Sequence, residues 1–115
     1  MAATDQVSRV FAALADPTRR HMLARLTLAD ATVNELAQPH DMSVQAISKH
    51  LRVLEEAGLV SRRREAQRRP VHLEAEVFDL MTTWIERYRR QAEQRYQRLD
   101  ALLADLPDEA EGEAK

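Results

Sequence analysis

The hydrophobic positions divide the start of the chain into two short helical segments. Between Asp5 and Ala15 the apolar residues recur every three or four positions, which places them on one face of a helix. Asp16-Pro17 then has the pattern of an N-cap followed by proline at the first helical position, and it predicts a second helix ending at about Leu28. The expected core residues of these two helices are Val7, Val10, Phe11, Leu14, Ala15, Met22, Leu23 and Leu26.

The following segments carry signals for helix starts and ends. Thr32-Val-Asn-Glu35 matches a capping box, and its helix has to end near Gln38 because Pro39 disfavours helical geometry in the residue before it. Ser43 is the expected N-cap of the next helix, and Gly58 stands where a glycine commonly ends a helix. The buried stripe of this helix is predicted at Val44, Ile47, Leu51 and Leu54.

A hairpin and a long helix are expected in the rest of the chain. Residues 59–64 and 69–73 flank a polar tip at 65–68, which predicts two antiparallel strands. The last helix is expected from about Ala75 to Leu106, a length of about 45 Å. A domain this small cannot cover the apolar stripe of such a helix along its whole length, so the expected partner is a second copy of the chain. The stripe follows a heptad rhythm at Met81, Ile85, Tyr88, Ala92, Leu99, Leu102 and Leu106.

The composition restricts the class of protein. The 115 residues correspond to one domain, and 44% apolar residues with only two Gly and four Pro favour a mainly α fold with a small β-hairpin. The absence of cysteine excludes disulfides, thiol catalysis and cysteine-ligated metals. Because neither a signal peptide nor an apolar run of about 20 residues is visible, we expect a cytoplasmic protein.

Charge is unevenly distributed along the chain. Residues 43–73 hold seven Lys and Arg against three Glu, a local net charge of +4. Residues 107–115 hold four acids against one Lys, a net charge of −3. The overall charge of −2 therefore hides a basic block that an anionic polymer would bind. We expect one domain at 1–106 and an acidic, disordered tail at 107–115, because Pro107 ends the last helix.

Three short helices, a basic hairpin and a long helix are the element order of a winged helix-turn-helix. The helix after Ser43 buries one face and leaves small polar, amide and cationic groups on the other, a set suited to base edges and phosphates in a DNA major groove. The hairpin tip is expected to reach the DNA backbone or the adjacent minor groove. The candidate DNA-binding residues are therefore Ser43, Gln45, Ala46, Ser48, Lys49, Arg52, Arg68 and Arg69.

Three stretches of the chain carry a family pattern. They are Phe11-Ala-Ala-Leu-Ala-Asp-Pro-Thr-Arg-Arg20, Val33-Asn-Glu-Leu-Ala37 and Ala46–Val60, the last with the signature Ser-x-His-Leu-x-x-Leu-x-x-Ala-Gly-Leu-Val. They resemble the ArsR/SmtB family of winged-helix transcriptional repressors, and the resemblance covers about residues 5–105. It implies a homodimer joined through the first and last helices, which represses transcription by blocking RNA polymerase at a pseudo-palindromic operator in double-stranded DNA.

The resemblance also implies residue roles. His50 lies in the Ser-x-His-Leu signature, so we add it to the DNA-binding candidates, with helix packing or a phosphate contact as its role. The interface residues implied by the resemblance and the apolar stripe are Val7, Val10, Phe11, Met81, Trp84, Ile85, Tyr88, Ala92 and Leu99.

The metal ligands of the family do not occur at the matching positions. Its Cys-Val-Cys-Asp-Leu motif corresponds to Thr32–Leu36, which lacks both thiolates. The Asp, His and Glu ligands of a second family site correspond to Ala75, Val77 or Glu76, Tyr88 and Gln91. We therefore expect no metal and no cofactor. The other histidines are His21, expected at the surface, His40, which forms a weak pair of ligands with Asp41, and His72, expected as a strand residue.

Several alternative functions remain open at this point. A regulator that responds to a small molecule would bind its effector in an apolar pocket at the dimer interface, and a metal sensor would need a non-standard His/Asp site. The residues for the effector pocket are Phe78, Met81, Trp84 and Tyr88. A helical adaptor would not bind DNA at all. An enzyme is not expected, because the only glycines are Gly58 and Gly112 and no nucleophile–base motif is present.

Overall fold

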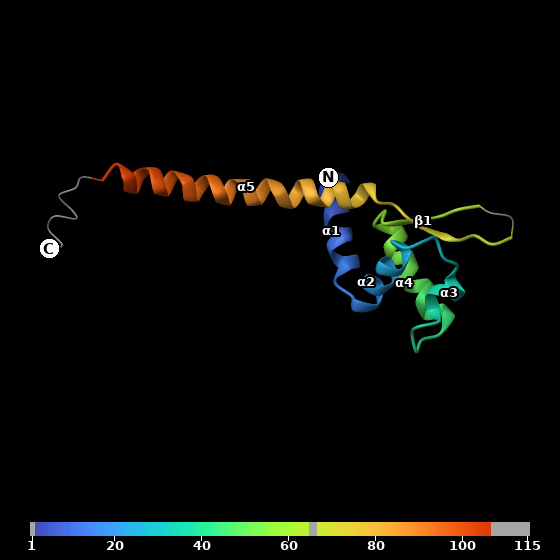
Figure 1. Ribbon diagram of the computed structural model, residues 1–115. Helices are drawn as coiled ribbons and strands as arrows, with labels where there is room; N and C mark the ends of the chain where they lie inside the picture. Colours follow the sequence, from blue (N-terminus) through green and yellow to red (C-terminus); the bar gives the residue numbers. More distant parts are fainter. Residues whose placement is uncertain (1, 65–66, 107–115) are drawn as a thin grey trace. The chain divides into compact units, whose positions relative to one another are not determined.

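The computed structural model of the chain describes residues 2–64 and 67–106. The chain divides into two compact units, residues 1–79 and residues 80–115. The first unit contains, in order, α1 (Ala2–Leu14), α2 (Pro17–Leu26), α3 (Val33–Ala37), α4 (Val44–Glu56), β1 (Val60–Arg62) and β2 (Val71–Leu73) (Figure 1). The predicted fold class, mainly α with a small hairpin in winged helix-turn-helix order, is confirmed. The hairpin residues 65–66 and the acidic tail, for which we predict disorder, lie outside the described residues.

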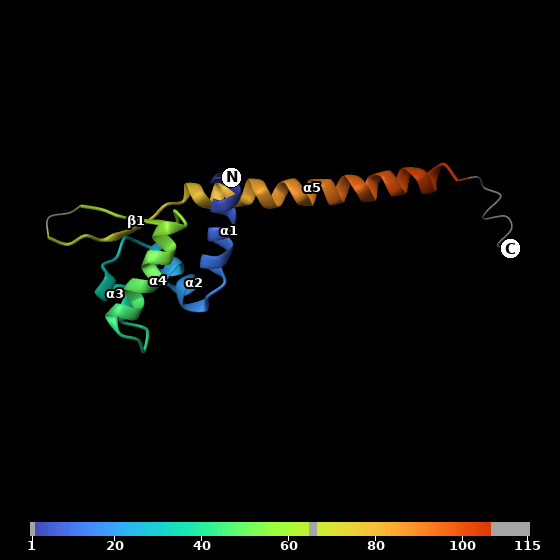
Figure 2. The same cartoon turned by 180° about the vertical axis from the view of Figure 1, so that it is seen from behind.

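The core of the first unit is organised around α4. This helix packs against α1, α2, α3 and β1, and both views show it between α2 and α3 (Figures 1 and 2). Its residues Ile47, Leu51 and Leu54 each have 0% of their surface exposed. Burying a side chain of this size contributes about 1.5–3 kcal/mol. The same three residues therefore hold α4 in place and fix which of its faces points outward.

Three residues that we predicted in the core are exposed. Val44 is 47% exposed. It is the first residue of α4, and the elements that cover the helix do not reach this end of the predicted stripe. Met42, two residues earlier, is exposed as well. Phe11 and Ala15 are also exposed. In α1 the buried residues are Val7, Val10 and Ala13, so the buried face is turned toward Ala13 and away from Phe11.

The predicted helix starts are confirmed in detail. Asp16 caps α2, with its Oδ2 accepting the backbone N–H of Arg19 at 3.0 Å, and Pro17 follows at the first helical position. The capping box at α3 is complete, because the N–H of Glu35 donates to the Thr32 hydroxyl and the N–H of Thr32 donates to the Glu35 carboxylate. α2 ends at Leu26 rather than at about Leu28, since i→i−3 bonds tighten the chain there.

Gly58 ends α4 and directs the chain into the hairpin. Its φ of +80° lies in the left-handed region that only glycine adopts without strain. The N–H of Gly58 donates to the Glu55 carbonyl and the N–H of Leu59 donates to the Leu54 carbonyl, both at 2.9 Å. This pair of bonds is a Schellman motif, which satisfies the last carbonyls of the helix.

The predicted hairpin is present, with strands of three residues each. β1 and β2 are antiparallel, and Ser61 lies opposite His72. β2 also has a neighbour on its other side, because Val71 and Ala31 exchange backbone hydrogen bonds of 2.7 and 3.2 Å. We did not predict this bridge; it anchors the base of the hairpin to the loop between α2 and α3.

The last helix, α5 (Glu76–Ala104), begins at the end of the first unit and continues through the described part of the second unit. Its bounds lie within two residues of the predicted ones, and Met81 is buried. Arg89 pairs with Glu86 and Glu93 at the spacings that support a helix, and the Arg89 side-chain bond lowers the pKa of Glu86. No helix among the described residues is long and apolar enough to cross a membrane. The exposed large apolar residues of α5 are Leu80, Ile85, Tyr88, Tyr96, Leu99, Leu102 and Leu103.

The charge of the Asp16 cap leads to a prediction about acid stability. The backbone N–H of Arg19, above all, holds the pKa of Asp16 below its ordinary value. A lowered pKa in the folded state stabilises the fold above the unfolded pKa of about 3.9, and this stabilisation disappears as the pH falls through the folded value. Because asparagine also caps helices, Asp16→Asn removes the charge and leaves a cap. We expect the variant to be less stable than wild type at pH 7, by up to about 1 kcal/mol.

Urea unfolding at a fixed protomer concentration measures this difference across the acid range. The two proteins should converge in stability at a pH below the folded pKa of Asp16. A stability difference that stays constant between pH 7 and the acid limit would show that the charge of Asp16 is not what stabilises α2.

Candidate nucleic-acid interface

The outward face of α4 carries the predicted recognition residues. Gln45, Lys49 and Arg52 are exposed, and Ala46 and Ser48 are half-buried beside them. Because the opposite face is fully buried, these side chains cannot turn inward without exposing the core. The structure thus places all five predicted residues of the helix where a ligand can reach them.

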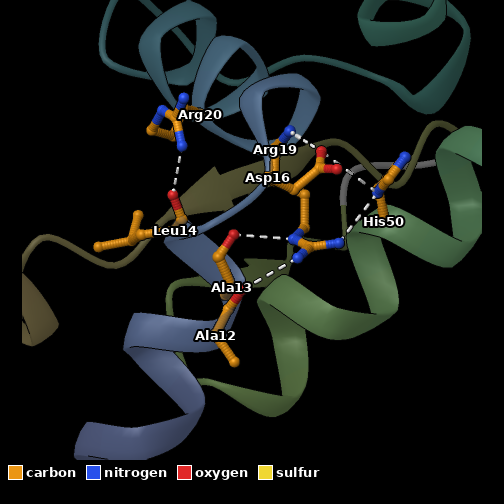
Figure 3. Close-up of polar contacts among 7 residues, drawn as sticks. All are labelled: Ala12, Ala13, Leu14, Asp16, Arg19, Arg20 and His50. Atoms are coloured by element: carbon orange, nitrogen blue, oxygen red, sulfur yellow. Dashed lines mark hydrogen bonds and ion pairs between the residues drawn. The ribbon is translucent and has the colours of Figure 1, made fainter.

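Ser43 and His50 have contacts within the protein as well. The hydroxyl oxygen of Ser43 accepts the backbone N–H of Ala46 at 3.1 Å and so caps α4, while the residue itself stays exposed. The side chain of His50 is 21% exposed, and its Nδ1 lies 3.2 Å from Nη1 of Arg19 and 3.9 Å from Oδ2 of Asp16 (Figure 3). Sequence reasoning missed the contact with Arg19, because it joins residues 31 positions apart and no local pattern indicates it.

The hairpin of β1 and β2, called the wing from here on, lies beside α3 and forms a basic groove with it. A cavity of about 410 Å³ is lined by Thr32, Val33, Asn34, Arg62, Gln67, Arg68 and Arg69. Arg68 is 68% exposed and lies 3.4 Å from the Glu35 carboxylate, and Arg69 is exposed. Arg62 is more buried and pairs with Glu55 of α4 at 3.5 Å. The structure therefore adds Arg62 to the predicted pair of wing arginines; its place in the basic block was the signal available in the sequence.

Glu35 connects the wing to the helix-turn-helix. The backbone N–H of Thr32, then its hydroxyl and the nearby Arg68, hold the pKa of Glu35 below its ordinary value. Glu35 therefore stays ionised at neutral pH and carries out two tasks, the capping of α3 and the pairing with Arg68.

The histidines do not form a metal site in the described part of the chain. Residues 2–64 and 67–106 contain no group of three or more His, Asp or Glu that could hold a metal ion. The rings of His21 and His40 stack at 6.1 Å, and Nδ1 of His72 lies 2.8 Å from the carboxylate of Asp30. His72 is thus a strand residue, as predicted, with an ion-pair partner that the sequence did not indicate.

The predicted interface residues divide into two groups. Val7, Val10 and Met81 are buried within the single chain, so they belong to the protomer itself and offer no surface to a partner. Trp84 is half-buried, with its ring 4.7 Å from that of Tyr88. The exposed members are Phe11, Ile85, Tyr88, Ala92 and Leu99. The effector pocket at a dimer interface stays a prediction.

Comparisons with known proteins agree with this geometry. Residues 14–63 match the model of a helix-turn-helix domain. The chain is 38% identical to the transcriptional repressor SdpR of Bacillus subtilis, over 53% of this chain and 68% of SdpR. It is also similar to the crystal structure of the ArsR family transcriptional regulator RHA00566, with 37% identity, a TM-score of 0.73, and coverage of 78% of this chain and 93% of the other.

A third similar protein is the homodimeric winged helix-turn-helix DNA-binding domain Mb0332 from Mycobacterium bovis, a possible ArsR-family regulator solved by NMR. It shares 30% identity, with a TM-score of 0.61 and coverage of 78% of this chain and 87% of the other. The family of these proteins is regulatory rather than catalytic. With the exposed polar face of α4, the basic wing and these similarities, the chain belongs to the ArsR-type family of winged helix-turn-helix, DNA-binding transcriptional regulators.

Proposed function

We propose that the protein is a cytoplasmic, homodimeric repressor that binds a pseudo-palindromic operator in double-stranded DNA and blocks the promoter there. The observation that supports this most is the division of α4 into a fully buried apolar face and an exposed face with Gln45, Lys49 and Arg52. A helix held this way presents a fixed set of side chains to a groove that is about 12 Å wide.

The chemistry of the exposed face suits the major groove. The amide of Gln45 matches the N6 and N7 groups of adenine, and the cations of Lys49 and Arg52 match guanine O6 and N7 or phosphate oxygens. Ala46 is small enough to contact a thymine methyl group. Base contacts of this kind provide sequence specificity, whereas the phosphate contacts set register and orientation.

The wing supplies phosphate contacts beside the recognition helix. Arg69 is exposed, and among the described residues Arg68 has only a surface pair with Glu35 to give up when it meets a phosphate. These cations neutralise backbone charge, so DNA affinity should fall steeply as salt is raised.

The apolar side chains of α5 support a dimer. Ile85, Tyr88 and Leu99 are exposed at heptad spacing along one helix, and such a stripe favours pairing with an identical helix. Mb0332 is homodimeric. A two-fold axis would place two recognition helices about 34–36 Å apart, which is one turn of DNA. A role in repression is supported by the similarity to SdpR, a transcriptional repressor.

Removal of the two recognition cations tests the DNA interface. The variant Lys49→Ala/Arg52→Ala should bind the duplex that wild type selects from a randomised pool at least about thirtyfold more weakly, at an expected cost of about 1–3 kcal/mol for each side chain removed. Electrophoretic mobility shift across a salt series measures the affinity and its salt dependence. The slope of log K against log salt should become shallower by about 0.9 for each phosphate that the variant no longer neutralises.

The matched control is Arg87→Ala/Arg90→Ala, which removes the same charge from exposed positions of α5. It should bind within about twofold of wild type, because its charges lie outside the proposed contacts. Wild-type affinity in the Lys49→Ala/Arg52→Ala variant would refute the assignment of α4 as the recognition helix.

A charge placed in the α5 stripe tests the dimer. Ile85→Asp should shift the protein to monomers at micromolar concentration and weaken DNA binding, because a buried carboxylate without a partner is costly. Thr83→Asp is the control, since position 83 is exposed and lies on the opposite side of α5. Sedimentation analysis gives the masses. A wild-type protein that sediments as a monomer would exclude the proposed assembly.

A further inference from the structure

Arg19 joins three helices of the first unit (Figure 3). Its guanidinium donates from Nε to the carbonyl of Ala13 at 2.8 Å and from Nη2 to the carbonyl of Ala12 at 3.0 Å. These carbonyls lie in the last turn of α1, beyond the reach of the regular i→i−4 bonds of the helix. The remaining nitrogen, Nη1, lies 3.2 Å from Nδ1 of His50 on α4. Two carbonyls therefore hold the guanidinium in one orientation, with its third edge toward His50.

This contact determines which nitrogen of His50 carries the proton. A guanidinium has only donors, so Nδ1 of His50 has to accept through its lone pair. Asp16, the other group near Nδ1, lies beyond hydrogen-bond distance at 3.9 Å, and its Oδ2 already accepts the backbone N–H of Arg19. The neutral imidazole is therefore the tautomer protonated at Nε2.

Nε2 is on the outer side of the ring. Figure 3 shows it pointing away from Arg19 and Asp16, and no described residue accepts a hydrogen bond from it. His50 lies one position after Lys49 on α4, at the flank of the exposed polar face, and its side chain keeps 21% of its surface exposed. A donor in this position has to find its acceptor outside the protein.

We propose that Arg19 is a positioning residue that holds His50 as an outward Nε2–H donor for a backbone phosphate of bound DNA. This inference rests on the proposed binding of DNA by α4 and adds a contact at the α2–α4 junction. A phosphate oxygen is the acceptor that matches a single fixed N–H group, and the bond to it is charge-assisted. Because the donor is neutral, the contact adds affinity without releasing a counterion.

The role of Arg19 becomes clear from the groups that surround Nδ1 of His50 when Arg19 is replaced. The carboxylate of Asp16 is then the nearest charged group to Nδ1, and it attracts the imidazole proton to that nitrogen. Nε2 becomes an acceptor, which repels a phosphate oxygen. Arg20 provides a matched control, because its Nη1 caps the Leu14 carbonyl of α1 at 2.7 Å and it has no bond to His50.

Nitrogen-15 NMR of the imidazole ring, on the full chain at about pH 8 where histidine is ordinarily neutral, measures the tautomer. We expect the proton on Nε2 of His50 in wild type and in Arg20→Ala, and on Nδ1 in Arg19→Ala. Wild-type protein with the proton on Nδ1 would overturn the proposal.

Binding to the duplex selected by wild type from a randomised pool tests the phosphate contact. His50→Phe should weaken binding about tenfold, the effect of removing one charge-assisted hydrogen bond, with an unchanged salt slope. His50→Gln keeps an amide donor and should bind within about twofold of wild type. Arg19→Ala should weaken binding about tenfold alone and have little further effect in the His50→Gln background, which is the coupling expected if Arg19 acts through His50. Arg20→Ala should leave binding unchanged.

Circular dichroism and thermal unfolding establish that each variant is folded before its affinity is compared. If His50→Phe binds as tightly as wild type while Lys49→Ala/Arg52→Ala no longer binds, the DNA interface stands and the His50 contact is refuted. If Lys49→Ala/Arg52→Ala keeps full affinity, the proposed function itself fails, whatever the tautomer of His50.

Discussion

The burial of one face of α4 is the constraint on which the proposed DNA-binding surface depends. α1, α2, α3 and β1 all pack against this helix, and Ile47, Leu51 and Leu54 are completely enclosed. A rotation of α4 by one residue, about 100°, would bring Ser48, Arg52 and Glu55 into the core. Each buried charge without a partner would cost several kcal/mol. The outward direction of the polar face is therefore set by the hydrophobic core rather than by the polar residues themselves.

The ends of α4 place this face relative to the wing. Ser43 caps the first turn, and Gly58 stops the helix with a Schellman motif that turns the chain into β1 within a few residues. Val71 lies opposite Arg62 of β1 and exchanges backbone hydrogen bonds with Ala31 on its other side, so the base of the wing has two anchors. The short connection and the bridge together hold the wing arginines near the helix-turn-helix.

Local signals in the sequence predict most of the fold, but they do not predict contacts between residues that are far apart in the sequence. The caps at Asp16, Thr32 and Ser43 depend on residues three positions apart, so spacing alone reveals them. Three pairs join residues 31 to 42 positions apart: Arg19–His50, Arg68–Glu35 and Asp30–His72. The sequence offers several other side chains of the same charge as partners for each residue, so it does not indicate which pair forms. Val44 fits the apolar period of α4, but periodicity does not report where the covering elements end. The position of the predicted recognition residues on the outer face of α4 follows from the buried stripe, which defines the opposite face; their contact with DNA stays a prediction.

Local rather than total charge decides how this protein meets DNA. Its net charge is −2, yet charges are screened over about 10 Å at 0.1 M salt, so acids outside the interface contribute little there. Within the wing, the two ion pairs differ in exposure. Arg62, 28% exposed, is held against Glu55 of α4, whereas Arg68, 68% exposed, has a surface pair with Glu35 that water already weakens. Glu35 makes its capping bonds with Thr32 alone, through its backbone N–H and its carboxylate. If Arg68 contacts DNA as proposed, it can therefore exchange a carboxylate for a phosphate, and the capping box that begins α3 does not depend on the carboxylate's bond to Arg68.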